Sequence, residues 1–117
     1  MSPTPLDDLA LRLRQFAAAR DWEQFHSPKN LAMALVAEAG ELAAEFQWLT
    51  QAQSSAPDAQ QLGRIRAEAA DVLIYLVRLA DRLGLDLLAA AAAKIQENEH
   101  RYPAEKVRGS AKKYDEY

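Results

Sequence analysis

The sequence contains no cysteine, which excludes disulfide bonds and thiolate metal sites. Glycine is scarce, with four residues in 117, and alanine and leucine are abundant, so the composition favours helices over strands. The formal charge of −3 is too weak and of the wrong sign to capture a nucleic-acid backbone. No apolar run approaches the roughly 20 residues that cross a bilayer. These absences predict an all-α protein that binds neither nucleic acid nor membrane.

The first ten residues, MSPTPLDDLA, lack the basic and then apolar build of a signal peptide, so we expect a cytoplasmic location. Half of the residues are hydrophobic and 26% are charged, which predicts a folded core rather than disorder. The length suits one domain over residues 1–117. Within it, the charged residues 103–117 are expected to form a surface tail.

Local start and stop signals predict four helices. Thr4, Pro5 and Asp7 have the order of an N-cap, a first-turn proline and a capping-box acid. Gly84 is expected to end a helix and Asp86 to begin the next one. The expected helices cover about residues 5–20, 28–50, 60–83 and 87–101, with a turn-rich connection over 21–26 and a loop over 51–60.

The third expected helix is apolar nearly all round between Val72 and Leu83. A chain of this size has few other helices with which to cover such a surface. We therefore expect a four-helix-type bundle that is completed by homo-oligomerisation.

Acidic residues recur at helical spacing on two of these helices. Glu38, Glu41 and Glu45 share one face of the second helix, among alanine, leucine and aromatic residues. Glu68 and Asp71 are three residues apart on the third helix, which gives the pattern E-x-x-E followed by E-x-x-D. If the two helices pack antiparallel, as their short connection implies, both pairs can converge.

Four converging carboxylates repel one another, and each is costly to remove from water. A divalent cation offsets both penalties, and oxygen ligands suit Mg²⁺ or Mn²⁺ better than zinc. Since Mg²⁺ is commonly held by carboxylates together with substrate phosphates, the pattern indicates a metal-dependent site for a phosphorylated ligand. The alternative is a solvated acidic stripe with local salt bridges to Arg64 and Arg66.

Several longer segments carry a family resemblance. They are DWEQFH (21–26), HSPKNLAMALVAEAGELAAEFQW (26–48), EAADVLIYLVRLADRLGLDL (68–87) and KIQENEHRYP (94–103). In this order they resemble the all-α nucleoside triphosphate pyrophosphohydrolases, and within them the MazG-like dCTP pyrophosphatase group. The resemblance extends over about residues 10 to 115.

This resemblance implies hydrolysis of the bond between the α- and β-phosphates of a nucleoside triphosphate, with Mg²⁺, in a helical dimer or tetramer. It favours dCTP or a modified dCTP as the substrate. It implies four metal ligands: Glu38, Glu41, Glu68 and Asp71. Many relatives place a further acid at the position of Ala44, whereas the nearest acid here is Glu45, about 100° further round the helix. Glu45 is therefore given no role, and no catalytic residue is assigned beyond a metal-activated water; the number of metal ions stays open.

The resemblance also implies a nucleoside pocket and contacts to the phosphates or sugar. The implied residues are Trp22, Glu23, Gln24, Phe25, His26, Trp48 and Tyr75 for the nucleoside, with Lys94, Asn98 and Tyr102 further along the chain. From spacing alone, the aromatic residues could equally belong to an ordinary core. Lys94 and Asn98 could equally form a solvated helix end, and Lys112 and Lys113 are expected to be solvated.

Two other classes of function fit parts of the sequence. Glu23 with His26, and Glu97 with His100, form two E-x-x-H pairs of the kind used by di-iron carboxylate bundles. One pair lies in a connection and the other in the last turn of a helix, whereas ligands of a bundle should lie in mid-helix. The remaining alternative is a non-catalytic helical interaction module whose acidic stripe binds no metal.

Overall fold

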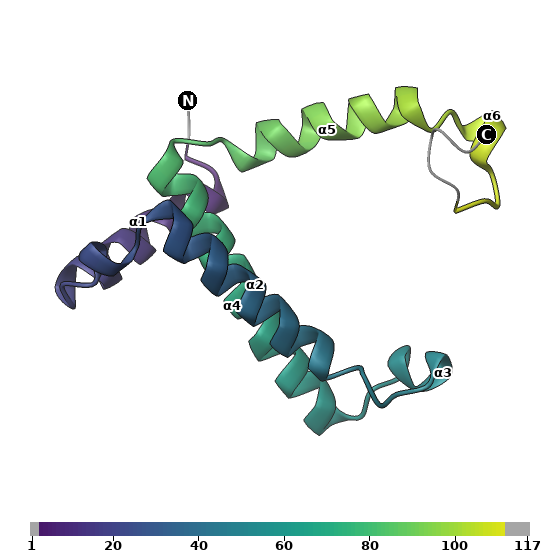
Figure 1. Ribbon diagram of the computed structural model, residues 1–117, viewed down its shortest axis with the longest axis horizontal. Coiled ribbons are helices and arrows are strands. Elements are labelled where there is room, and N and C mark those ends of the chain that lie inside the picture. Colours follow the sequence, from purple (N-terminus) through teal and green to yellow (C-terminus); the bar gives the residue numbers. More distant parts are fainter. Residues whose placement is uncertain (1–2, 112–117) are drawn as a thin grey trace. The chain divides into compact units, whose positions relative to one another are not determined.

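The computed structural model describes residues 3–111, and within them every regular element is helical (Figure 1). In chain order the elements are α1 (Pro5–Ala19), the 3₁₀ helix η1 (Glu23–Phe25), α2 (Pro28–Ala44), α3 (Gln51–Ser54), α4 (Ala59–Leu83), α5 (Leu87–Arg101) and α6 (Ala104–Val107). The predicted all-α class is confirmed. Lys112 and Lys113 lie outside the described residues, and part of the expected tail forms α6.

Contacts divide the chain after Gly84 into two units, the first with α1 to α4 and the second with α5 and α6. The prediction of a single domain stays a prediction. None of the helices within residues 3–111 is long and apolar enough to cross a membrane.

The predicted helix signals are present as hydrogen bonds. At the start of α1, the Asp7 N–H donates to the Thr4 hydroxyl at 3.1 Å, and the Thr4 N–H donates to the Asp7 carboxylate at 2.8 Å. Gly84 ends α4 in the left-handed conformation, with φ of 68°, which favours glycine. Asp86 accepts from the Ala89 N–H and caps α5. Short-range chemistry therefore sets these ends.

The second helix ends earlier than predicted, at Ala44 instead of about residue 50. Residues 45–49 form tighter turns, and Thr50 then begins α3 through a capping box with Gln53. Phe46 and Trp48 continue the apolar pattern in sequence, but they lie in these turns and not on α2. The predicted loop over 51–60 accordingly contains α3, and α4 begins after the cap at Asp58.

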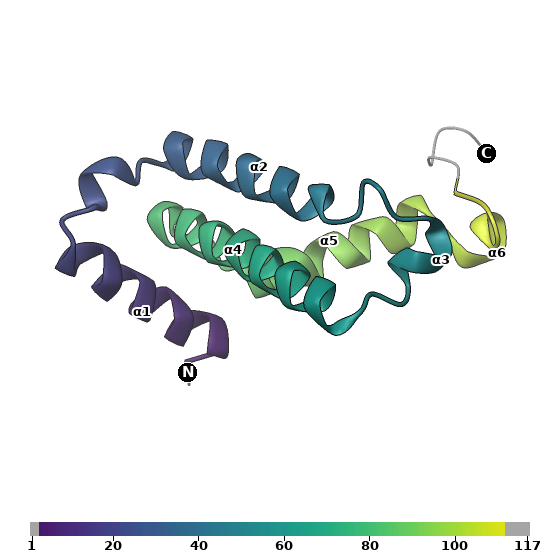
Figure 2. The ribbon, with the colours of Figure 1, turned by 90° about the horizontal axis from the view of Figure 1, so that it is seen from below.

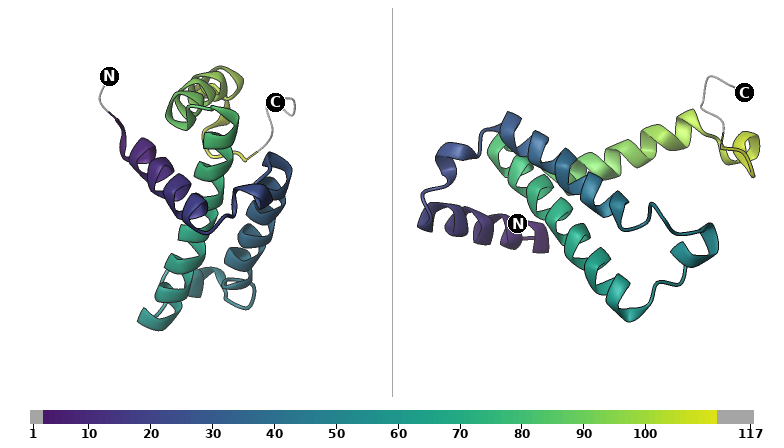
Figure 3. Two further views of the ribbon diagram at one scale, coloured as in Figure 1. Left: turned by 90° about the vertical axis from the view of Figure 1, so that its left-hand side faces the viewer. Right: turned by 60° about the horizontal axis from the view of Figure 1, so that its bottom comes forward.

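In the first unit, α2 and α4 lie side by side and antiparallel, and α1 packs on the other side of α4 (Figures 2 and 3). This confirms the predicted antiparallel pairing of the two acid-bearing helices. The buried apolar residues of the described chain are Ala17, Leu31, Val77 and Ala80, each no more than 4% exposed. Arg78 is the buried charged residue, at 3% exposed.

Candidate active site

The antiparallel pairing of α2 and α4 brings acids from both helices together. Carboxylate oxygens of Glu38, Glu41 and Glu68 all lie within 4.8 Å of one another. Glu38 and Glu68 are partly buried, whereas Glu41 is exposed. Asp71, on the turn after Glu68, is partly buried and lies outside this close group.

Two carboxylate oxygens of this group lack hydrogen-bond donors among the described residues. Glu38 Oε2 and Glu68 Oε2 are shielded from solvent, and neither accepts a hydrogen bond from the residues that the structure describes. Burial, then repulsion by Glu41 and Asp71 and proton sharing with Glu41, raises the pKa of Glu38. Burial, followed by the charge of Glu41 and hydrogen bonding to it, raises the pKa of Glu68. Shielded carboxylate oxygens that lack donors are the ligands that a hard divalent cation requires.

Glu45 is separated from this group and has a partner of its own. The Arg64 Nε donates to Glu45 Oε2 at 3.0 Å, which joins the end of α2 to the first turns of α4. The acid whose position departs from the spacing that the resemblance implies therefore forms an ion pair with a residue of the neighbouring helix. This contact gives Glu45 a structural explanation that the sequence pattern lacked.

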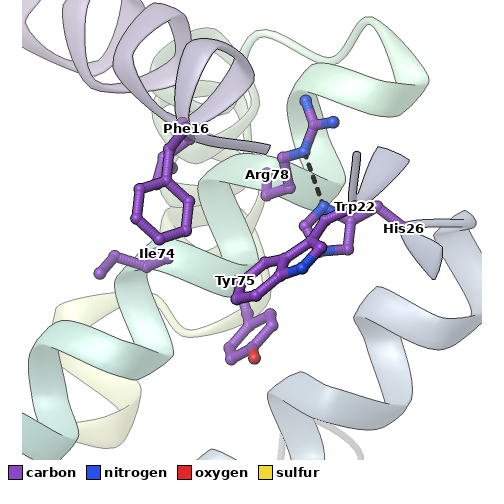
Figure 4. A pocket seen from close by; sticks show the side chains of 7 residues that line it. Phe16, Trp22, His26, Ile74, Tyr75 and Arg78 are labelled. Carbon is purple, nitrogen blue, oxygen red and sulfur yellow. Dashed lines mark hydrogen bonds between the residues drawn. The ribbon is translucent and has the colours of Figure 1, made fainter. Parts of the chain in front are cut away.

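A cavity of about 270 Å³ lies in the first unit, beside α4 (Figure 4). Three of the predicted nucleoside contacts, Trp22, His26 and Tyr75, line it. The other lining residues are Leu13, Phe16, Ile74 and Arg78. The Trp22 ring meets Phe16 edge to face with centroids 5.6 Å apart, and it meets His26 at 6.5 Å. This is an apolar slot with aromatic walls and a few polar groups, the usual character of a small-molecule site.

The connection between α1 and α2 sets the position of Trp22. Asp21 adopts the left-handed conformation, with φ of 55°, so the chain reverses directly after α1. The Trp22 N–H then donates to the Ala17 carbonyl at 2.9 Å, and the Gln24 side chain donates to the Asp21 carbonyl at 3.0 Å. Gln24 thus stabilises the turn, and it does not line the cavity.

The other predicted nucleoside contacts lie elsewhere in the first unit. Phe25 is 59% exposed and Trp48 is 87% exposed, and neither lines the cavity. Glu23 faces Arg78, with Glu23 Oε1 3.8 Å from Arg78 Nη2, in a neighbouring polar hollow. The structure therefore brings together only part of the predicted nucleoside set.

Lys94, Asn98 and Tyr102 belong to the second unit. On α5, Lys94 Nζ lies 3.1 Å from a Glu97 carboxylate oxygen and Arg101 Nη2 lies 2.7 Å from the other, so these cations lower the pKa of Glu97, with the Lys94 hydrogen bond as the main cause. The Tyr102 N–H donates to the Asn98 carbonyl at 2.8 Å and closes the helix.

The two E-x-x-H pairs do not form part of the acid group. Glu23 and His26 lie in and next to η1, and Glu97 is engaged in ion pairs along α5. The group of Glu38, Glu41 and Glu68, found by a search of the described residues, contains no histidine. The arrangement gives the di-iron alternative no support.

Leu13, Phe16, Ile74 and Arg78 line the cavity but were not predicted as site residues, and Arg78 is the charged one among them. Its Nε donates to His26 Nδ1 at 3.3 Å (Figure 4). Its Nη1 donates to Asp81 Oδ2 at 3.3 Å. The available signal was an arginine inside the otherwise apolar run IYLVRLA. Its partner His26 is 52 positions away, which no local pattern reveals.

Comparison with known proteins gives consistent results. Residues 33–117 match the MazG-like family. The chain is 47% identical to dCTP pyrophosphatase 1 of Homo sapiens, covering 98% of this chain and 69% of the human protein. It is 50% identical to dCTP pyrophosphatase 1 of Rattus norvegicus, covering 97% and 68%. A crystal structure of a pyrophosphatase from Archaeoglobus fulgidus superposes with a TM-score of 0.81 at 34% identity, over 88% of this chain and 96% of that one.

Proposed function

Because the chain belongs to the MazG-like family, we propose that its acid group binds a divalent cation and that its substrate is dCTP or a modified dCTP. The chain is a nucleotide pyrophosphohydrolase. Water hydrolyses the bond between the α- and β-phosphates of the triphosphate. The products are a nucleoside monophosphate and pyrophosphate. Removal of an unwanted nucleotide from the cellular pool is the role that we propose for this reaction, in the cytoplasm.

The observation that supports the metal is the pair of shielded carboxylate oxygens, Glu38 Oε2 and Glu68 Oε2, close to Glu41. These three residues and Asp71 are the proposed ligands of Mg²⁺, with Mn²⁺ as the alternative ion. When bound, such an ion neutralises phosphate charge and lowers the pKa of a bound water. The four side chains come from two packed helices, so they are held in place before the substrate arrives.

The observation that supports a nucleoside ligand is the aromatic cavity beside the same helix α4. Trp22 and Tyr75 offer ring faces to a base, and His26 offers a polar ring edge. The remaining proposed contacts are Glu23, Gln24, Phe25, Trp48, Lys94, Asn98 and Tyr102. The exposure of Phe25 and Trp48 leaves both side chains accessible to a ligand or to a second chain.

A homo-oligomer, dimer or tetramer, is proposed because the first unit leaves large apolar side chains uncovered. On α2, Met33 is 63% exposed and Val36 is 67% exposed, one turn apart on the same face. On α4, Leu73 and Leu83 are 43% and 53% exposed. A second copy of the chain that covers these faces would supply the core that a single copy lacks.

A panel of nucleoside triphosphates with Mg²⁺ tests the proposal. The assay scores pyrophosphate against orthophosphate as the first product, and we expect pyrophosphate, fastest from dCTP or a 5-substituted dCTP. Glu38→Gln and Asp71→Asn are expected to abolish turnover while the helical content is retained. Orthophosphate as the first product, or parent-like turnover in either variant, would count against the proposed site.

A further inference from the structure

Arg78 has an unusual setting for a charged side chain. It lies on α4 between apolar neighbours, and its side chain is only 4% exposed. A guanidinium does not lose its proton in a protein, so this charge needs partners. Its Nη1 donates to Asp81 at 3.3 Å, and Asp81 also accepts from the Arg14 Nε of α1 at 2.9 Å. On the other side, Glu23 lies 3.8 Å from Nη2. Asp81 of α4 and Glu23 of η1 therefore flank the guanidinium, and Arg14 of α1 holds the same Asp81 carboxylate.

The remaining contact of this guanidinium determines the state of His26. The Arg78 Nε donates to His26 Nδ1 at 3.3 Å. Since arginine can only donate, His26 Nδ1 must carry a lone pair and no proton. A neutral imidazole then carries its proton on Nε2, on the far side of the ring from this contact.

We propose that Arg78 is a positioning residue that fixes His26 as a neutral ring with an Nε2–H donor for the base in the cavity, and that it thereby selects cytosine over uracil and thymine. Both residues line the cavity that also holds Trp22 and Tyr75. The inference rests on the proposed nucleotide substrate, and it goes beyond that proposal by naming how the base is read.

Selection follows from the chemistry of the base edge. Cytosine presents an acceptor at N3, whereas uracil and thymine present an N–H donor there. A ring free to exchange its proton between Nδ1 and Nε2 could accept from one base and donate to the other. A ring held as the Nε2–H form can only donate from that nitrogen. In a pyrimidine with N3–H, two hydrogen-bond donors then face each other and neither is satisfied. Buried polar groups that are left unpaired in this way are a strong source of discrimination.

Burial and the nearby arginines also favour a neutral His26 ring. Burial, together with the positive charges of Arg78 and Arg82 on α4, lowers the pKa of His26, and Glu23 of η1 opposes them weakly. Arg14 of α1 lines the adjacent polar hollow and adds a further positive charge there. The ring is therefore expected to stay neutral at pH values where an ordinary histidine becomes protonated.

The ring nitrogens of His26 can be observed directly, because the chain has only two histidines. We would record ¹⁵N chemical shifts of the imidazole nitrogens against pH in the ligand-free full chain, and assign them with His100→Gln. The expected result is the Nε2–H form of His26, with a titration point below the 6.5 of an ordinary histidine. In Arg78→Met the expected result is a mixed tautomer and a titration point that moves up.

Arg82→Met is the matched control, since it removes a neighbouring positive charge but leaves the Arg78–His26 hydrogen bond. This variant should keep the Nε2–H form of His26. Its titration point should move up, but by less than in Arg78→Met. A parent spectrum with the proton on Nδ1, or an Arg78→Met spectrum identical to that of the parent, would overturn the inference.

The same variants are then compared for the ratio of kcat/KM between dCTP and dTTP. We expect the ratio to fall by about tenfold or more in Arg78→Met and to hold in Arg82→Met. An unchanged ratio in Arg78→Met overturns the assigned selection even if the ring spectrum changes. If the parent cleaves no nucleoside triphosphate, the proposed function fails, while the ring spectra still decide whether Arg78 sets the state of His26.

Discussion

Glu45, at the C-terminal end of α2, tests which acids near this helix act in the reaction and which only stabilise the fold. The perturbation is Glu45→Gln, which keeps the shape of the side chain and removes its charge. The Arg64 Nε lies 3.0 Å from Glu45 Oε2, but the two side chains are 49% and 22% exposed, so water screens the pair. Exposed pairs of this kind contribute about 0.2–1 kcal/mol to the free energy of unfolding. With about 2.1 cal/mol/K per residue over 117 residues, that loss lowers Tm by about 1–4 °C.

The assay combines thermal unfolding at a fixed protein concentration with pyrophosphate release. Arg64→Met and the double variant Glu45→Gln/Arg64→Met complete a double-mutant cycle. The coupling free energy between the two positions should equal the free energy of unfolding that is lost when the ion pair is broken. Turnover of Glu45→Gln should stay within about twofold of the parent, because Glu45 lies outside the acid group; a factor of two corresponds to about 0.4 kcal/mol. A tenfold loss of turnover with an unchanged Tm would refute the structural role and would make Glu45 a participant in the reaction.

Three further outcomes are expected. Adding MgCl₂ should raise the Tm of the parent but not of Glu68→Gln, because a ligand that binds only the folded state stabilises it; equal shifts in both would argue against the acid group as the site. Leu31→Ala, at a side chain 1% exposed, should cost about 2–5 kcal/mol in a denaturant titration, and a cost below 1 kcal/mol would show that this core is not closed. Because the pKa of His26 is lowered from 6.5, the unfolded chain takes up a proton first as the pH falls, so folding should lose stability below about pH 6.5; His26→Gln should remove that part of the pH dependence, measured as the difference between the two proteins.

The sequence predicted those features that depend on neighbouring residues or on helical spacing. Thr4 with Asp7, and Gly84, set helix ends through local hydrogen bonds and a left-handed backbone, and both are present as predicted. Glu38, Glu41 and Glu68 could be expected to converge because one helical face and one antiparallel pairing are enough to bring them together.

What the sequence could not predict depends on distant partners or on competition between signals. The apolar pattern continues through Phe46 and Trp48, but the capping box at Thr50 begins a new helix, so α2 ends earlier than its periodicity suggests. The hydrogen bond of Arg78 depends on a distant partner, His26, in the connection between η1 and α2. The first error arose where a local cap overrode a periodic pattern, and the second where the partner is too far along the chain for a local pattern to reveal it.

The raised pKa values of Glu38 and Glu68 would link the proposed cation binding to the release of protons. A carboxyl group must give up its proton before it can bind a metal, so at a pH where these groups are partly protonated the proposed ion would displace hydrogen ions into the buffer. The measured heat of binding then includes the ionisation heat of that buffer, and the apparent affinity weakens as the solution is acidified. In a cell, acidification would therefore act as a competitor of the proposed metal ion.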